Sequence, residues 1–77
     1  MKIQLKLFGQ LTEVIGKSQL ELENINNSDL LVKKILADFP ELNKYEFLIS
    51  VNKKVLREIQ YFKSGDEVAF LPPFAGG

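Results

Sequence analysis

The chain of 77 residues contains neither cysteine nor histidine. Without cysteine there is no disulfide and no thiolate nucleophile, and without histidine the most common general base and transition-metal ligand are missing too. The sequence therefore argues against an independent hydrolase and against a zinc site. Whatever chemistry the protein takes part in is expected to rest on its backbone terminus or on a partner.

An excess of charge of one sign and a long apolar run are missing as well. Ten basic residues balance ten acidic ones, which argues against nucleic acid or an anionic membrane as the main partner. No apolar run approaches the roughly 18–20 residues of a membrane span, and the N-terminus lacks the apolar region of a signal peptide. We therefore expect a cytoplasmic protein that binds no metal or cofactor of its own.

What the sequence does contain is enough for one compact domain. Apolar residues make up 45% of the chain, although its length is near the lower limit for folding without disulfides or metals. Residues 2–8 alternate between polar and apolar, which predicts a strand with one buried face. Residues 18–25 alternate in the same way. The segment between them, bracketed by Gly9 and Gly16, is expected to form a compact turn rather than an independent helix.

The two predicted strands carry charges on their solvated faces. If they pair as an antiparallel hairpin, Lys2 and Lys6 lie on the same face as Glu21 and Glu23. Opposite charges across a strand pair stabilise it by a few tenths of a kcal/mol. A catalytic pair of carboxylates is the alternative interpretation of Glu21 and Glu23, and a solvated strand face is much the more common origin of such a pattern.

A helix is predicted next. Residues 26–29 are polar and mark its start, with Ser28 as the expected N-cap and Asp29 placed favourably for the helix dipole. Apolar residues then recur every three or four positions as far as Phe39, which predicts an amphipathic helix of about three turns that ends before Pro40. Its apolar stripe is expected to cover the sheet.

The rest of the chain is predicted to add short strands to the sheet. The segments are a polar connection at 41–46, a strand at 47–51, a turn at 52–54, a short strand at 55–56, an irregular segment at 57–63, a turn at 64–67 and a final strand at 68–71. One helix on one face of a mixed sheet of four to five strands predicts an α+β fold of the ubiquitin-like β-grasp class. In that class the first and last strands lie side by side in the middle of the sheet.

The end of the chain has an unusual composition. Pro72 and Pro73 cannot donate to a sheet, so the last strand must stop before them. Ala75, Gly76 and Gly77 then form a thread with almost no side chains, which can enter a narrow channel and ends in a carboxylate. We expect residues 1–71 to form the domain and residues 72–77 to extend from it as a tail. The alternative is a frayed terminus without a role.

Alternation also predicts an exposed apolar patch beside this tail. If the apolar residues of the first strand face the helix, Phe8 faces away from it. In the last strand Val68 and Phe70 face inward, which leaves Ala69 and Leu71 outward. Phe8, Leu71 and Phe74 are therefore expected to form a surface that binds a partner. The alternative is that Phe8 packs beneath the turn that follows it.

The terminal block GDEVAFLPP at 65–73, followed by FAGG, closely resembles the end of the small subunits of molybdopterin synthase. The segment FGQLTEVIG at 8–16 and the Val51-Asn52 pair agree with that family too, so the resemblance spans the whole chain. Two positions depart from the family. Gly9 stands where alanine is frequent, which is expected to be a mild change. Thr12 stands where a basic residue is frequent, so any ion pair of the family at that position is in question here.

The resemblance implies a sulfur carrier of molybdenum cofactor biosynthesis that is not catalytic alone. An adenylating enzyme of the ubiquitin-activating type would transfer AMP from ATP to the Gly77 carboxylate, and a sulfur donor would replace the AMP to give a thiocarboxylate. The large synthase subunit would then receive the tail, and the sulfur would pass to precursor Z. Phe8, Leu71 and Phe74 would be the apolar anchors, in a heterotetramer with two carriers on a dimer of large subunits.

Three other functions stay open. A thiamine-type sulfur carrier would use the same chemistry, but its tails generally lack the double proline found at 72–73. A ubiquitin-like modifier would instead join Gly77 to lysines of other proteins. The third possibility is a plain interaction domain whose tail is incidental.

Overall fold

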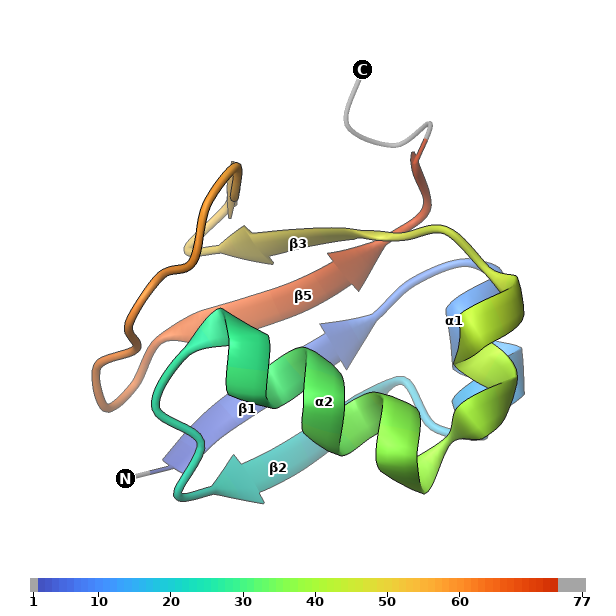
Figure 1. The fold of residues 1–77 in the computed structure, drawn as a ribbon, viewed down its shortest axis with the longest axis horizontal. Helices are drawn as coiled ribbons and strands as arrows, with labels where there is room; N and C mark the ends of the chain where they lie inside the picture. The colour runs from blue at the N-terminus through green and yellow to red at the C-terminus, as the bar shows by residue number, and fades with distance from the viewer. Residues whose placement is uncertain (1, 74–77) are drawn as a thin grey trace.

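The structure of the protein, a computed structural model, describes residues 2–73. Its elements are β1 (Lys2–Leu7), α1 (Gln10–Ile15), β2 (Gln19–Glu23), α2 (Ser28–Asp38), the 3₁₀ helix η1 (Pro40–Lys44), β3 (Leu48–Val51), β4 (Lys54–Val55) and β5 (Glu67–Leu71). Figure 1 shows that the strands form one sheet and that α2 lies across one of its faces. Four residues of the predicted tail, Phe74, Ala75, Gly76 and Gly77, lie outside the described residues.

The strand order in the sheet is β2-β1-β5-β3-β4. β1 and β5 pair in parallel at its centre, with Leu7 opposite Phe70, and the other neighbours are antiparallel. The predicted α+β, ubiquitin-like β-grasp fold is thereby confirmed, including the adjacency of the first and last strands. Because parallel strands end on the same side of a sheet, the end of β1 and the end of β5 come together at one edge (Figure 1).

The core lies between α2 and the sheet. Leu31 and Ile35 of α2 are buried, and the helix ends before Pro40 as predicted. The ring of Phe47 stacks on that of Phe70 with the centroids 4.5 Å apart. Burying a side chain of this kind stabilises the fold by about 1.5–3 kcal/mol. The buried cluster consists of Ile3, Leu5, Leu7, Leu11, Ile15, Leu31, Ile35, Leu42, Val51, Phe62, Val68 and Phe70.

The segment between β1 and β2 is a helix, where the sequence predicted a turn. A helix of six residues is marginal by itself. α1 forms because Leu11 and Ile15, one turn apart, are both buried in the core. The two glycines that were expected to bracket a turn are its caps: Gly9 precedes the helix with φ 60° and ψ −138°, and Gly16 ends it in the left-handed region.

Two details around α2 also differ from the prediction. The N-cap is Asn27 rather than Ser28, because Asn27 Oδ1 accepts a hydrogen bond from the Leu30 amide at 2.9 Å. Ser28 is the first residue of the helix, and its Oγ accepts from the Gln60 amide at 3.0 Å. After α2, the connection at 41–46 is not simply polar, because η1 buries Leu42 completely.

The turn between β3 and β4 determines how β5 begins. Asn52 and Lys53 both have positive φ, 51° and 73°, which confirms the predicted turn, and β4 begins one residue earlier than predicted. Asn52 Nδ2 donates to Asp66 Oδ1, and Asn52 Oδ1 accepts from the Glu67 amide, both at 3.1 Å. One side chain therefore ties the turn to the first residue of β5.

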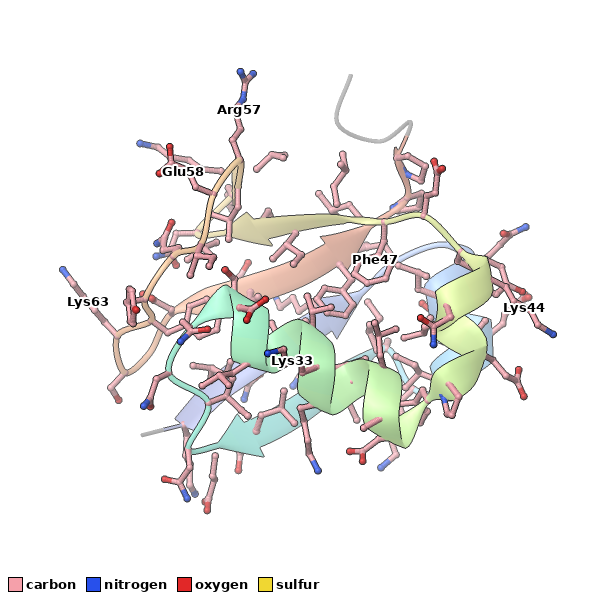
Figure 2. All side chains as sticks on the ribbon, in the orientation of Figure 1. Lys33, Lys44, Phe47, Arg57, Glu58 and Lys63 are labelled. Atoms are coloured by element: carbon pink, nitrogen blue, oxygen red, sulfur yellow. The ribbon has the colours of Figure 1, made fainter. Side chains whose placement is uncertain are left out.

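Charged side chains surround this core. Figure 2 shows four labelled charged residues at the periphery, Lys44, Arg57, Glu58 and Lys63, and Lys33 on α2. Phe47, in contrast, lies over the sheet. Within residues 2–73, no helix is long and apolar enough to span a bilayer. The same residues contain no group of three or more acidic, histidine or cysteine side chains placed to hold a metal ion.

Candidate functional site

The face of the sheet turned away from α2 carries a shallow hollow that runs along β5, from Glu67 at its start to Leu71 at its end. Its volume is about 270 Å³. Phe8 and Leu71 both line it, which confirms that these two predicted residues come together; Phe74 is outside the described residues. The residues that line the hollow are Phe8, Ser50, Lys53, Glu67, Ala69 and Leu71.

Strand alternation is the reason that Phe8 lies on this surface. Ile3, Leu5 and Leu7 of β1 are buried against the helix side, so the next residue, Phe8, faces the other way and is 45% exposed. The alternative, in which Phe8 packs beneath α1, is therefore excluded, and Leu11 and Ile15 take that position instead. A half-exposed aromatic grouped with other apolar side chains is typical of a surface that binds a partner.

Ion pairs lie beside the hollow on the same face. Lys6 Nζ is 3.4 Å from Glu67 Oε2, and Lys2 Nζ lies 3.6 Å from Glu21 Oε1 and 3.5 Å from Glu23 Oε1. The predicted charge pairing between the two N-terminal strands is confirmed for Lys2, while Lys6 pairs with β5 instead. The two glutamates therefore belong to a solvated strand face. Exposed pairs of this kind contribute about 0–1 kcal/mol, so they form a polar margin rather than a source of stability.

The root of the tail lies at the same edge of the sheet. β5 ends at Leu71, as predicted from the prolines. Pro72 and Pro73 line a second hollow, of about 210 Å³. We call its remaining lining residues the proline seat; they come from the start of α1 and from the connection after η1: Gly9, Gln10, Leu11, Tyr45 and Glu46.

The two positions that depart from the resembled family, Gly9 and Thr12, both lie at the start of α1. Thr12 Oγ1 donates a hydrogen bond to the Leu7 carbonyl at 3.2 Å, so its side chain braces the start of α1. Gly9 was expected to be a mild change, and in this chain it is not. A Cβ atom added there would lie 2.9 Å from Cγ of Pro72, closer than real Cβ contacts.

Sequence reasoning missed some residues of both hollows. Alternation places Ala69 outward with Leu71, as the structure confirms. Ser50 lies directly opposite Ala69 in the β3–β5 pair, so only a worked-out strand register would have placed it there. Tyr45 and Glu46 carried no such signal, because their position depends on η1, which the sequence did not predict.

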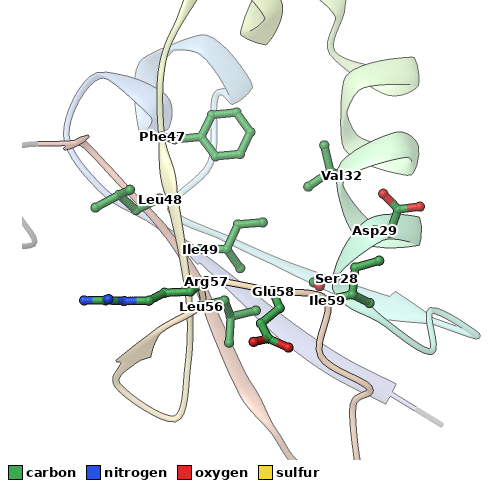
Figure 3. A pocket seen from close by; sticks show the side chains of 10 residues that line it. All are labelled: Ser28, Asp29, Val32, Phe47, Leu48, Ile49, Leu56, Arg57, Glu58 and Ile59. Atoms are coloured by element: carbon green, nitrogen blue, oxygen red, sulfur yellow. The ribbon is translucent and has the colours of Figure 1, made fainter.

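A third hollow lies between the beginning of α2 and β3 (Figure 3). Its volume is about 310 Å³. Figure 3 shows Val32, Phe47 and Ile49 around it, while Leu48 and Arg57 point away from the helix. None of the residues predicted to bind a partner lines it. The candidate site is therefore the hollow at Phe8 and Leu71 together with the root of the tail.

The side chains described at this site favour binding rather than catalysis. They are apolar groups, two hydroxyls, one amide and a few charges, and the chain has no histidine or cysteine. A reacting group is therefore not found among them. The site can hold a partner against the sheet at the point where the chain leaves the fold.

Known proteins are similar to this chain in sequence and in architecture. The model of the ThiS family matches residues 5–77. The molybdopterin synthase sulfur carrier subunit of Haemophilus influenzae is 32% identical over 75 residues, which cover 91% of this chain and 93% of that one. The subunit of the same name from Dictyostelium discoideum is 29% identical over 83 residues, which cover 99% and 96% of the two chains.

Solved structures agree in fold. The small archaeal modifier protein 1 from Methanosarcina acetivorans matches with a TM-score of 0.80 and 24% identity, over 99% of this chain and 96% of that one. A chain from the complex of subunits 1 and 2 of molybdopterin-converting factor from Helicobacter pylori matches with a TM-score of 0.74 and 24% identity, over the full length of both. At these identities the likeness establishes the fold, whereas the match of nearly the whole sequence shows that this chain belongs to the ThiS family.

Proposed function

We propose that the protein is the sulfur carrier subunit of a molybdopterin synthase. The observation that carries the proposal is the position of the exposed hollow at Phe8 and Leu71. It runs along β5 as far as Leu71, the last residue of the strand, from which the chain continues toward its diglycine. A partner bound there lies next to the residue at which the tail begins. The curated relatives named above are sulfur carrier subunits of this enzyme.

The chemistry belongs to the carboxylate of Gly77. An adenylating enzyme joins it to AMP from ATP and releases pyrophosphate. A sulfur donor then displaces AMP from the acyl carbon and leaves a thiocarboxylate. Adenylation is needed because a carboxylate oxygen is a poor leaving group, whereas AMP is a good one. This chain has no phosphate-binding glycine loop, so ATP is bound by the adenylating enzyme.

The second half of the reaction takes place on the large subunit. Phe8, Leu71 and Phe74 hold the carrier there, and the tail enters the active site of the large subunit. The thiocarboxylate sulfur attacks a carbon of precursor Z and displaces an oxygen group from it, which gives a thioester between Gly77 and the substrate. Water then cleaves the bond between the acyl carbon and sulfur, so the sulfur stays on the substrate and Gly77 returns to a carboxylate. The complex of subunits 1 and 2 from Helicobacter pylori supports a large-subunit partner, and we propose a heterotetramer of two carriers and two large subunits.

The test is the intact mass of the protein purified from its own cells. We expect a species in which one terminal oxygen is exchanged for sulfur, and we expect it to be absent from a variant that lacks Gly77. Lys33→Ala is the matched control, because Lys33 is exposed on α2 far from the tail in sequence. An unmodified terminus, in cells whose adenylating enzyme and sulfur donor are active, would contradict the proposal.

The pathway is tested with purified components. The thiocarboxylate form, the large subunit and precursor Z should together yield the dithiolene product, and the unmodified carrier should yield none. If the carrier transferred sulfur in a thiamine-forming system but not to precursor Z on the large subunit, it would belong to the thiamine pathway instead. Adducts in which Gly77 is joined to lysines of other proteins would indicate a modifier.

A further inference from the structure

The end of β1 touches the root of the tail through an unusual pair of residues. Leu7 lies opposite Phe70 in the parallel pair of β1 and β5. Two residues further along, Gly9 and Pro72 come next to each other, and the ladder cannot continue because proline has no N–H. A Cβ on Gly9 would lie 2.9 Å from Pro72 Cγ and 3.9 Å from Pro72 Cδ. The proline ring therefore occupies the space that any side chain at position 9 would need.

Hydrogen bonds at the start of α1 hold the backbone on which the proline ring packs. Gly9 has φ 60° and ψ −138°, a backbone conformation that suits glycine. Its carbonyl accepts a hydrogen bond from the Thr12 amide at 3.2 Å, and the Thr12 hydroxyl donates to the Leu7 carbonyl. Leu11, the second residue of α1, is buried in the core. The start of α1 is therefore held in place when a partner binds the tail.

The other side of the proline seat is formed by the connection that follows η1. The Tyr45 amide donates to the Leu42 carbonyl at 3.0 Å, which ties this segment to a fully buried residue. Tyr45 and Glu46 face the same hollow as Gly9 and the two prolines. The Pro72 ring therefore packs against Gly9 on one side and faces Tyr45 and Glu46 across the hollow on the other.

We propose that Gly9 is a positioning residue for the tail. By leaving room for the Pro72 ring, it fixes the direction in which the chain leaves β5 and so directs Gly77 toward the active site of the partner. This role rests on the proposed function. It is separate from the hollow at Phe8 and Leu71, which holds the body of the carrier but does not set the direction of the tail.

The geometry explains why a small displacement at the root matters. From Pro72 to Gly77 an extended chain reaches about 17 Å, at roughly 3.3–3.6 Å per residue. A rotation of about 10° at the root would therefore move the end of an extended tail by about 3 Å. Misplacing a reacting group by about 1 Å can cost about 100-fold in rate. Because the partner also holds the tail, we expect part of this loss.

The experiment compares two glycine substitutions. Gly9→Ala places a methyl group against the proline ring, whereas Gly16→Ala introduces alanine at φ 84° with no atom within 4 Å of the new Cβ. Both variants carry backbone strain, and each should lower Tm by about 4–8 °C or more. Only Gly9→Ala should slow single-turnover sulfur transfer, by about tenfold, with its Kd for the large subunit within about threefold of the original chain.

A double substitution separates the contact from the strain. Pro72→Ala removes the ring, so adding it to Gly9→Ala should recover part of the lost rate, and the combined loss should be smaller than the product of the two single losses. Tyr45→Ala opens the other side of the proline seat without backbone strain. It should slow transfer by about threefold with little change in Tm, so the proposal stays testable even if Gly9→Ala does not fold.

Each outcome decides the matter. Equal slowing by Gly16→Ala, multiplicative losses in the double variant, or a Gly9→Ala chain that transfers at the original rate would overturn the positioning role alone. If Gly9→Ala does not fold, the positioning role would be overturned by a Tyr45→Ala variant that transfers sulfur as fast as the unsubstituted chain. An original chain that binds the large subunit but transfers no sulfur would overturn the proposed function, and the positioning role with it.

Discussion

Two phenylalanines on neighbouring strands show how differently the two faces of the sheet are used. Phe70 of β5 faces α2, is completely buried and stacks on Phe47. Phe8 follows β1, faces the other way and is 45% exposed. The same type of side chain therefore stabilises the fold on one face of the sheet and is available to a partner on the other face. Hydrophobicity alone does not distinguish these roles; the parity of the position along the strand does.

The largest effect is expected from removing the buried member of this pair. Phe70→Ala should lower the free energy of unfolding by about 3–5 kcal/mol, because it leaves a cavity under α2 and removes the stack on Phe47. A domain of this size has about 4–12 kcal/mol in total, so much of the protein should unfold at moderate temperature. Urea denaturation followed by circular dichroism measures the change; a loss below about 1 kcal/mol would show that the core does not depend on this ring.

The exposed member should behave in the opposite way. Phe8→Ala should raise the Kd for the large subunit by about 30-fold, or about 2 kcal/mol, because it removes the main aromatic group from the hollow. The free energy of unfolding should change by less than about 1 kcal/mol. Titration calorimetry and urea denaturation of the same sample measure both. Intact binding with a stability loss like that of Phe70→Ala would remove the distinction between the two faces.

An intermediate effect is expected at the turn between β3 and β4, which is tied to the start of β5 by hydrogen bonds rather than by apolar packing. Asn52→Ala removes two side-chain hydrogen bonds, to Asp66 and from the Glu67 amide, at a residue with φ 51°. It should cost about 1–2 kcal/mol of stability. Asn52→Gly removes the same bonds but tolerates positive φ, so it should cost less. If the two variants were equally stable, backbone strain would make no contribution here.

The smallest effect is expected from the charges on the outer face. Lys6→Ala breaks the pair with Glu67, and both side chains are exposed enough for water and salt to screen them. The loss of stability should be about 0.5 kcal/mol or less, and it should vanish in about 1 M salt. Thermal denaturation at low and high salt tests this, and a loss that persists in salt would place the ion pair among the stabilising contacts.

Much of the fold could be predicted because it depends on short-range pattern. The alternation of β1 placed Phe8 outward, and the apolar repeat from Leu31 to Ile35 placed α2 over the sheet. The same patterns predicted that Phe8 and Leu71 would meet. These inferences need only the period of a strand or a helix, which the local sequence contains.

What could not be predicted depends on contacts between distant segments. α1 and η1 are too short to form alone, and they exist because Leu11 and Leu42 are buried by the rest of the chain. Ser28 is not the N-cap because its hydroxyl accepts from Gln60, far away in sequence. The proximity of Gly9 and Pro72 requires the register of β1 on β5. No local pattern contains these facts.

The central position of β5 has a consequence for how the protein comes into being. Without β5, the chain has a β1–β2 hairpin and a β3–β4 hairpin that share no hydrogen-bonded neighbour, because β5 lies between them. Joining them requires closing a loop of most of the chain, from β1 to β5, which is a slow step in folding. The hollow at Phe8 and Leu71 is lined by Phe8, which follows β1, and by three residues of β5. The partner surface is therefore formed in the same step that completes the sheet. A chain in which β1 and β5 have not yet paired lacks this surface.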